Sequence, residues 1–297
     1  MEALVSPKKT ISYTQFSTYL RCPHKWRLDY LEGRRVYEDS IQTLFGTSFH
    51  NTLQHYLSVM YRDGVSAADQ IDLAAYLQHQ MVENYKISMQ KTSQHFATSE
   101  QLQEYLLDGI AILRYIQSHR RVFFSYKQHK LLGIELPLEV SINSNVWFNG
   151  FIDLVILDER TGRVKIWDIK TSTRGWNKRQ KKDLTKTAQL ILYKQFYAKQ
   201  FGIDPNKIDV EYFIVRRKIA EQATFPLKRV QTFVPSHGKV TCNKVYNLLD
   251  DFVDTAFTST GEYNTQATYP AIQNSLCMYC QHNNTDLCKK SQRKLKS

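Results

Sequence analysis

Two aspartates and a lysine stand in adjacent apolar segments in the middle of the 297-residue chain. Asp153 belongs to the first segment, and Asp168 and Lys170 belong to the second. A polar turn centred on Arg160 and Thr161 separates the segments, and this pattern predicts a β-hairpin. If the strands pair about that centre, Asp153 faces Asp168. Alternation along the strands then places both carboxylates and the lysine on one face.

Both segments are rich in Val, Ile and Leu, which favours strands covered on both faces. Carboxylates there are costly unless a cation compensates their charge, and hard divalent cations such as Mg²⁺ take carboxylate oxygens. A lysine beside them can orient a water or stabilise charge that develops on a phosphate. The alternative is a half-exposed strand end with one Asp–Lys ion pair. Glu135 is either a further acid of this site or a charge at the sheet edge, and we favour the site.

The chain carries 40 Lys and Arg against 28 Asp and Glu, a formal net charge of +12. This excess favours a polyanionic partner, most simply nucleic acid. A basic loop follows Lys170 directly, and beside a phosphodiester site we expect it to contact the DNA backbone, although such a run is usually a solvated face. The predicted DNA-binding residues are Arg174, Trp176, Lys178, Arg179, Lys181 and Lys182.

Targeting and motor signals are missing from the sequence. No apolar run of transmembrane length and no signal-peptide pattern occurs, and no P-loop pattern is present. We therefore expect a cytoplasmic or nucleoid-associated protein, bound to no membrane and without its own ATP motor. A virus-encoded protein acting in a host cytoplasm fits the same pattern.

Five cysteines are too few and too unevenly spaced for a disulfide framework. Three of them, Cys277, Cys280 and Cys288, form a C-x₂-C-x₇-C cluster that indicates a bound metal in a reducing compartment. Three thiolates need a fourth ligand. Cys22 fits, and the competitors are His282 and Cys242.

Helices dominate the first 130 residues. Residues 1–10 show no periodicity, so we expect a loose arm without regular structure there. A helix capped by Ser12 or Thr14 follows them. A second helix carries His50, which by itself is more often a hydrogen-bonded structural residue than a ligand. Two helical segments between residues 67 and 121 predict an insert without catalytic residues.

Strands then alternate with a helix. The sequence predicts strands over residues 130–142, 146–157 and 164–171, followed by a helix over residues 183–201. Gln189 and Tyr193 are four residues apart, so they share one face of that helix. The whole chain is predicted to be an α/β protein.

The order of short motifs resembles the RecB-type branch of the PD-(D/E)XK nuclease superfamily. More narrowly, it is similar to the iron–sulfur exonucleases: the AddB-type nuclease domain, the CRISPR-adaptation nucleases and their phage relatives. The resemblance leaves residues 61–130 uncovered. The motifs that carry it are Tyr19–Pro23 (Y-L-x-C-P), Gly46–His50 (G-x-x-x-H), Gly150–Asp153 (G-x-x-D), Asp168–Lys170 (D-x-K), Gln189–Tyr193 (Q-x₃-Y) and the cysteine cluster.

This resemblance implies a restriction-endonuclease-like core: a mixed central β-sheet flanked by helices, with a helical insert and a C-terminal cysteine cluster. It implies a Mg²⁺- or Mn²⁺-dependent deoxyribonuclease, most simply an exonuclease on DNA ends or single strands. His50, Asp153, Asp168 and the Ile169 carbonyl would hold the metal, and Lys170 would activate the attacking water. Gln189 and Tyr193 would line the active site and position DNA.

The resemblance also implies a [4Fe–4S] cluster on Cys22, Cys277, Cys280 and Cys288. Its role would be to fasten the N-terminal helix to the C-terminal segment. The last spacing of the cluster is longer than is usual in the family, and zinc on the same thiolates is the alternative. A zinc-binding interaction protein with incidental acidic residues is therefore a further reading.

We expect one nuclease domain over residues 1–297. Residues 1–60 would supply the N-terminal helices, residues 61–130 the insert and residues 131–235 the core. Residues 236–297 would supply a last helix, the cysteines and a basic tail. The alternative to a nuclease is a DNA-binding accessory subunit of a recombination, repair or replication complex. Any helicase partner would be a separate protein.

Overall fold

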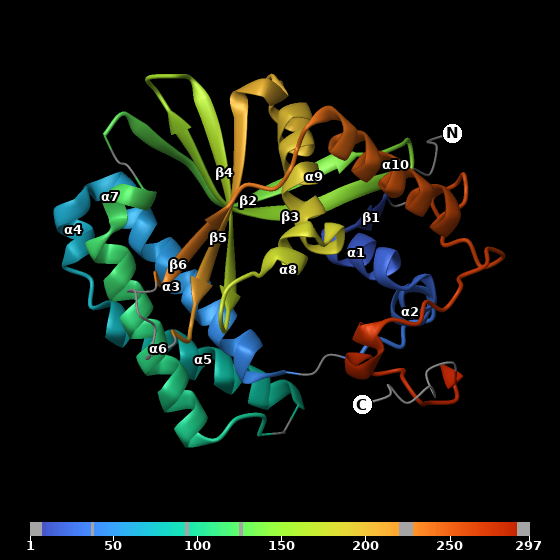
Figure 1. The fold of residues 1–297 in the computed structure, drawn as a ribbon, viewed down its shortest axis with the longest axis horizontal. Coiled ribbons are helices and arrows are strands. Elements are labelled where there is room, and N and C mark those ends of the chain that lie inside the picture. The colour runs from blue at the N-terminus through green and yellow to red at the C-terminus, as the bar shows by residue number, and fades with distance from the viewer. Residues whose placement is uncertain (1–7, 37–38, 93–94, 125–126, 220–227, 290–297) are drawn as a thin grey trace, which may run out of the picture.

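The computed structural model describes residues 8–36, 39–92, 95–124, 127–219 and 228–289. One six-stranded mixed sheet lies at the centre, and helices cover both of its faces (Figure 1). This α/β architecture, a mixed sheet flanked by helices, confirms the predicted fold class. The strands are β1 (Lys9–Ile11), β2 (His129–Ser141), β3 (Val146–Asp158), β4 (Arg163–Ser172), β5 (Ile208–Arg216) and β6 (Val230–Phe233).

The sheet order is β1-β3-β4-β5-β6, and β2 pairs with β3 as well. β1 runs parallel to β3 and β4 runs parallel to β5, whereas the pairs β2–β3, β3–β4 and β5–β6 are antiparallel. β1 includes Lys9 and Thr10, so the expectation that residues 1–10 lack regular structure is wrong for these two. A strand of three residues is too short to leave a period in the sequence, and its pairing with β3 stabilises it.

The predicted helical insert covers one face of the sheet (Figure 1). The helix that carries His50, α3, precedes the insert and packs on β2 and β4 on the same face, and it joins the insert helices and the sheet in one apolar cluster. Ser40 begins α3 by accepting a hydrogen bond from the amide of Thr43. The elements on this face are α3 (Ile41–Asp63), α4 (Val65–Asp69), α5 (Leu73–Thr92), α6 (Ser99–Ser118) and α7 (Arg120–Phe123).

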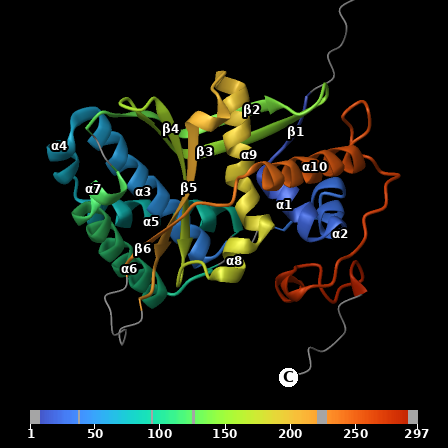
Figure 2. The ribbon, with the colours of Figure 1, turned by 45° about the horizontal axis from the view of Figure 1, so that its top comes forward.

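The N- and C-terminal helices cover the other face, with α1 beside α10 and α9 against the sheet (Figure 2). Ser12, not Thr14, is the N-cap of α1. Trp26 is fully buried there between the rings of Phe252 and Tyr269. The elements are α1 (Tyr13–Arg21), α2 (Pro23–Trp26), a π-turn (Arg27–Leu31), α8 (Lys178–Lys182), α9 (Leu184–Phe201), a short 3₁₀ turn (Pro205–Lys207), α10 (Lys239–Ala256) and a 3₁₀ turn (Ser275–Tyr279).

The predicted hairpin forms β3 and β4, and Val155 faces Ile166 as expected. The ladder between these strands ends at Leu154 and Trp167, however, so Asp153 and Asp168 do not form the expected pair. β4 continues to pair with β5 as far as Ser172. The two central strands therefore diverge at the aspartates, because β3 turns towards β1 and β2 while β4 stays with β5.

The basic C-terminal tail and the expected lack of a membrane-spanning segment are the remaining expectations about the fold. The basic tail predicted after Lys289 lies outside the described residues. Among the helices that the structure describes, none combines the length and the apolar character needed to cross a bilayer.

Candidate active site

The divergence of β3 from β4 places the carboxylate of Asp153 in the gap between the strands. Its Oδ2 accepts a hydrogen bond of 2.6 Å from the backbone N–H of Ile169, which has no ladder partner on β3. A buried amide needs such an acceptor, so the bond also fixes the aspartate. Glu135 lies on β2 next to this point and adopts a φ of 47°, a conformation that is uncommon outside glycine. An irregular backbone therefore presents both acids at one place.

Three side chains from three elements form a candidate metal group. The ligand atoms of His50 on α3, Glu135 on β2 and Asp153 on β3 all lie within 4.8 Å of one another. His50 Nδ1 is 3.8 Å from Asp153 Oδ2. One turn along α3, Gln54 Nε2 donates to Glu135 Oε1 at 2.6 Å and to the Asp153 carbonyl at 3.3 Å. Two carboxylates and an imidazole suit Mg²⁺ or Mn²⁺.

Asp168 begins a second group that faces α9. Lys170 Nζ lies 2.8 Å from Asp168 Oδ2 and donates to Oδ1 at 3.0 Å. Lys170 also donates to Gln189 Oε1 at 3.1 Å, and Gln189 Nε2 donates to the Tyr193 hydroxyl at 3.1 Å. The predicted pair Gln189 and Tyr193 thus reaches the D-x-K lysine through hydrogen bonds. Of the predicted catalytic residues, all five lie in these two adjoining groups.

Charge in the site calls for a cation. Burial raises the pKa of Asp153 and that of Asp168 to about 6, although Lys170 acts to lower both. Asp168 is 1% exposed, and its Oδ2 lies near Lys170 without the geometry of a hydrogen bond. Burial, then Lys170, lowers the pKa of His50, so its imidazole is neutral and offers a lone pair. These residues fit a divalent metal, because a bound cation would compensate the negative charge of the buried carboxylates.

Glu135 replaces Asp168 in the set of closest ligand atoms. The sequence predicted His50, Asp153, Asp168 and the Ile169 carbonyl as ligands, with Glu135 as a further acid. Asp168 is engaged by Lys170 instead, and the backbone of Ile169 contacts both Asp153 and His50. The roles of these residues towards a metal stay predictions.

A cleft of about 460 Å³ opens beside Lys170, where β3 and β4 separate. Gly150 keeps the cleft open, because a Cβ atom at this position would lie 3.2 Å from Tyr193 Cε1 and its hydroxyl oxygen. The lining has three parts: residues 10–15, residues 149–151, and the catalytic candidates Lys170, Gln189 and Tyr193. Residues 10–15 were not identified from the sequence, because their place depends on the pairing of β1 with β3.

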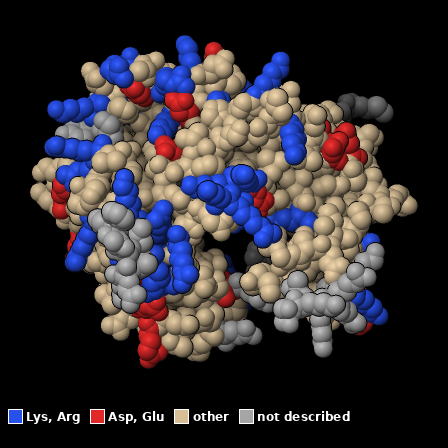
Figure 3. All heavy atoms as spheres, in the orientation of Figure 1, with Lys and Arg blue, Asp and Glu red and all other residues tan. Residues whose placement is uncertain are grey.

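The basic loop lies on the same side of the sheet as α9, and Figure 3 shows Lys and Arg gathered over α8 next to a hollow. The prediction that Trp176 contacts DNA is wrong for its ring, which is 9% exposed and packs 4.9 Å from Tyr212. Its amide donates to Gln231 at 2.8 Å, so Trp176 anchors the loop. Arg174, Lys178, Arg179 and Lys182 are exposed and Lys181 is half-buried.

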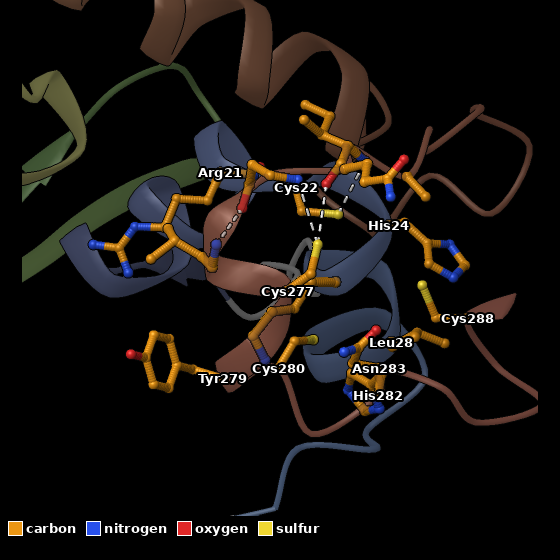
Figure 4. Close-up of a pocket in the computed structure, with 16 residues that line it drawn as sticks. Arg21, Cys22, His24, Leu28, Cys277, Tyr279, Cys280, His282, Asn283 and Cys288 are labelled. Carbon is orange, nitrogen blue, oxygen red and sulfur yellow. Dashed lines mark hydrogen bonds between the residues drawn. The ribbon is translucent and has the colours of Figure 1, made fainter. Parts of the chain in front are cut away.

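The four predicted cluster cysteines, Cys22, Cys277, Cys280 and Cys288, line one cavity of about 180 Å³. Cys22 and Cys277 point towards one another there (Figure 4). The backbone amide of Ile272 donates to Cys22 Sγ and that of Asn274 donates to Cys277 Sγ, each at 3.4 Å. Amide donors of this kind stabilise metal-bound thiolates.

The two competitors for the fourth ligand have other partners. Cys242 lies on α10, and its thiol donates to the carbonyl of His237 at 3.2 Å. His282 lines the cavity, but its Nε2 is 2.7 Å from Asp29 Oδ1 in a buried pair. Cys22 is therefore the sulfur that the fold brings to the other three.

Comparisons with known proteins show which fold and which superfamily the chain shares. A crystal structure from Eubacterium rectale, described as a candidate exonuclease, aligns with a TM-score of 0.53 at 12% identity, over 98% of this chain and 90% of the other. The structure of SSO0001 aligns with a TM-score of 0.36 at 12% identity, over 94% of this chain and 86% of the other. No curated protein matches the sequence. The family model for the PD-(D/E)XK nuclease superfamily matches residues 10–288, and the chain belongs to this superfamily.

Proposed function

We propose that the protein is a Mg²⁺- or Mn²⁺-dependent deoxyribonuclease of the RecB-type iron–sulfur branch. The observation that carries this proposal is the pair of adjoining groups at the divergence of β3 and β4. His50, Glu135 and Asp153 form an oxygen- and nitrogen-rich metal group, and Lys170, which lines the open cleft, lies near enough to act on His50 and Asp153. A phosphodiester in the cleft would meet a metal, a cation and ordered hydrogen-bond donors together.

The residues divide the work of hydrolysis. When bound, a divalent metal supplies a polarised water and offsets charge on the phosphate. Glu135 and Asp153 hold this position with charge, and the neutral His50 holds it with a lone pair. Asp168 and Asp153 outweigh the effect of burial and raise the pKa of Lys170. Lys170 therefore stays protonated and stabilises negative charge on the phosphate, and Gln189 and Tyr193 fix the direction of its ammonium group.

We further propose that the enzyme acts as an exonuclease. The order of motifs and the neighbour described as a candidate exonuclease support this choice. A cleft of about 460 Å³ also suits one strand better than a duplex, because it is the size of a small-ligand pocket.

Cleavage of end-labelled linear DNA and of circular single-stranded DNA, each with Mg²⁺ or Mn²⁺, tests the proposal. We expect metal-dependent shortening of linear DNA and no cutting of circles. The position of the label gives the polarity. Cutting of circles would contradict the exonuclease, and binding without any cutting would favour the accessory subunit over the nuclease.

We also propose that Cys22, Cys277, Cys280 and Cys288 hold a [4Fe–4S] cluster. Support comes from the cavity that the four sulfurs line and from the amide donors to Cys22 and Cys277. The cluster would join α1 and α2 to the C-terminal segment. This is a structural role, because the cysteines lie outside the cleft.

Replacing Cys277 by serine is expected to remove the cluster and to lower the solubility of the protein, because a serine hydroxyl is a poor ligand for iron. Iron content and the visible absorption of anaerobically purified protein measure the change. Cys242→Ser, on α10, is the matched control and should keep both signals. Zinc without iron in the wild type would contradict the iron–sulfur assignment.

A further inference from the structure

A second group of positive side chains lies on the facing helices α1 and α9. Arg21 ends α1, and its side chain points away from the cysteines (Figure 4). Its Nε donates to Thr185 Oγ1 at 3.3 Å and its Nη2 to the Thr185 carbonyl at 3.4 Å. A guanidinium has five N–H donors, so these contacts to neutral groups hold it in place and leave donors for a ligand.

Lys186 follows Thr185, the residue that Arg21 contacts, on α9. Its Nζ is 5.6 Å from the centroid of the Trp176 ring, which limits where it can point. Burial lowers the pKa of Lys186, and the charges of Arg21 and Lys170 lower it further. Arg21 of α1 and Lys170 of β4 thus both lie near enough to act on Lys186 of α9.

Nearby acids do not neutralise Arg21 and Lys186 by direct contact. Among the described residues, no carboxylate forms an ion pair with either of them. Asp183 acts on Lys186 from a distance, but its Oδ1 accepts hydrogen bonds from the amide and hydroxyl of Thr185 at 2.9 and 2.7 Å. Cations that crowd together without a contacting acid are stabilised by binding an anion.

Another cation pair of this chain shows the contrast. Arg217 and Lys218, at the end of β5, both pair with Glu104 and Asp108 at distances between 2.5 and 3.0 Å. Their charge is satisfied within the protein. In the part of the chain that the structure describes, Arg21 and Lys186 lack such carboxylate partners, so their positive charge is left to interact with an anionic ligand.

Arg21 and Lys186 lie close to the cleft that Lys170 lines. Tyr13 lines the cleft, and both Arg21 and Asp168 act on the pKa of its hydroxyl. That hydroxyl is buried and has no partner within hydrogen-bond geometry. Thr185 precedes Gln189 by about one helical turn, or about 5.4 Å. Arg21, which contacts Thr185, therefore lies about one turn of α9 from Gln189, which contacts Lys170.

We propose that Arg21 and Lys186 form a two-cation clamp for the DNA phosphate next to the scissile one. The proposal rests on the proposed nuclease for the identity of the scissile phosphate, but not for the clamp itself. Arg21 supplies a planar donor pair and Lys186 a point charge. By holding one phosphate, the clamp would set which bond lies at Lys170.

Binding of a fluorescent single strand in EDTA tests the clamp without any cleavage. Arg21→Gln and Lys186→Gln are each expected to weaken binding about tenfold at low salt. Each should also lower the slope of log affinity against log salt by about 0.7. Arg160→Gln, at the exposed hairpin turn, is the matched control and should change neither value. Unchanged affinity and slope in both clamp variants would overturn the proposal.

Two further measurements separate a clamp from a structural effect. The double variant should lose less than the sum of the single losses, because both side chains hold one phosphate. A scan of single neutral methylphosphonate linkages should weaken the wild type at one position and leave the double variant unaffected there. Additive losses with no such position would contradict the clamp. Binding that depends on Arg21 and Lys186 in a protein that cuts no DNA would uphold the clamp and overturn the nuclease.

Discussion

Asp168→Asn is expected to lower the rate of DNA cleavage by about 100- to 1000-fold while the protein keeps its fold. The amide has the shape of the carboxylate, but it removes the charge that pairs with Lys170 at 2.8 Å and that faces the metal group. Initial rates on end-labelled single strands measure the loss, and circular dichroism checks the fold. The matched control is Glu139→Gln, an exposed acid on β2 outside the site, which should cut at the wild-type rate.

The stability of the same variant distinguishes a catalytic from a structural role. Burial raises the pKa of Asp168 from 3.8 to about 6, so its charged form is unfavourable in the folded protein. Each pKa unit corresponds to about 1.4 kcal/mol. Without metal at about pH 8, Asp168→Asn should therefore be at least as stable as the wild type. A folded variant that cuts DNA at the wild-type rate would refute the role of Asp168, and a variant that unfolds would show a structural one.

Saturating Mn²⁺ is expected to raise the melting temperature by about 5 °C or more at about pH 8, and by much less at about pH 5.5. Asp153 and Asp168 both have a pKa of about 6 when folded, against 3.8 as the ordinary value. The folded protein therefore binds more protons than the unfolded chain between pH 4 and pH 6. Stability falls as pH rises through this window, and a metal that binds the charged carboxylates restores it above pH 6.

Thermal unfolding with and without Mn²⁺ at the two pH values measures this dependence. Glu135→Gln is the control variant, because a glutamine can still accept the hydrogen bond from Gln54 but lacks the charge of a ligand. It should lose most of the stabilisation by Mn²⁺. A metal effect that is equal at both pH values would show that the metal does not bind at the group that contains Asp153.

The hairpin and its chemistry could be predicted because their signals are local. Alternating apolar residues and the turn around Arg160 place Val155 opposite Ile166. The same reasoning extended the ladder to Asp153 and Asp168, and there it failed. A ladder ends where one strand finds a better partner, and the pairing of β3 with β1 and β2 is a contact between distant parts of the chain.

Trp176 shows the same limit for a single side chain. In the sequence it stands among lysines and arginines, a setting that suggested contact with DNA. Its ring packs instead on Tyr212 of β5, and its amide binds Gln231 of β6. These partners lie more than thirty residues away, so composition near Trp176 carries no information about them.

The sequence by itself determined the α/β class, the D-x-K strand and the pair on α9, because spacing along a helix or strand is a local property. It also identified the three cysteines of the C-x₂-C-x₇-C cluster, whereas their meeting with Cys22 was expected only from the resemblance. His50, Glu135 and Asp153 were expected at one site, and only the tertiary structure decided that Glu135 lies closer to the other two than Asp168 does, and that Arg21 lies near enough to act on Lys186. The physical reason is that these meetings depend on where β3 leaves β4 and how α1 packs on α9. Both are set by burial of apolar surface across the whole sheet and not by any nearby residue.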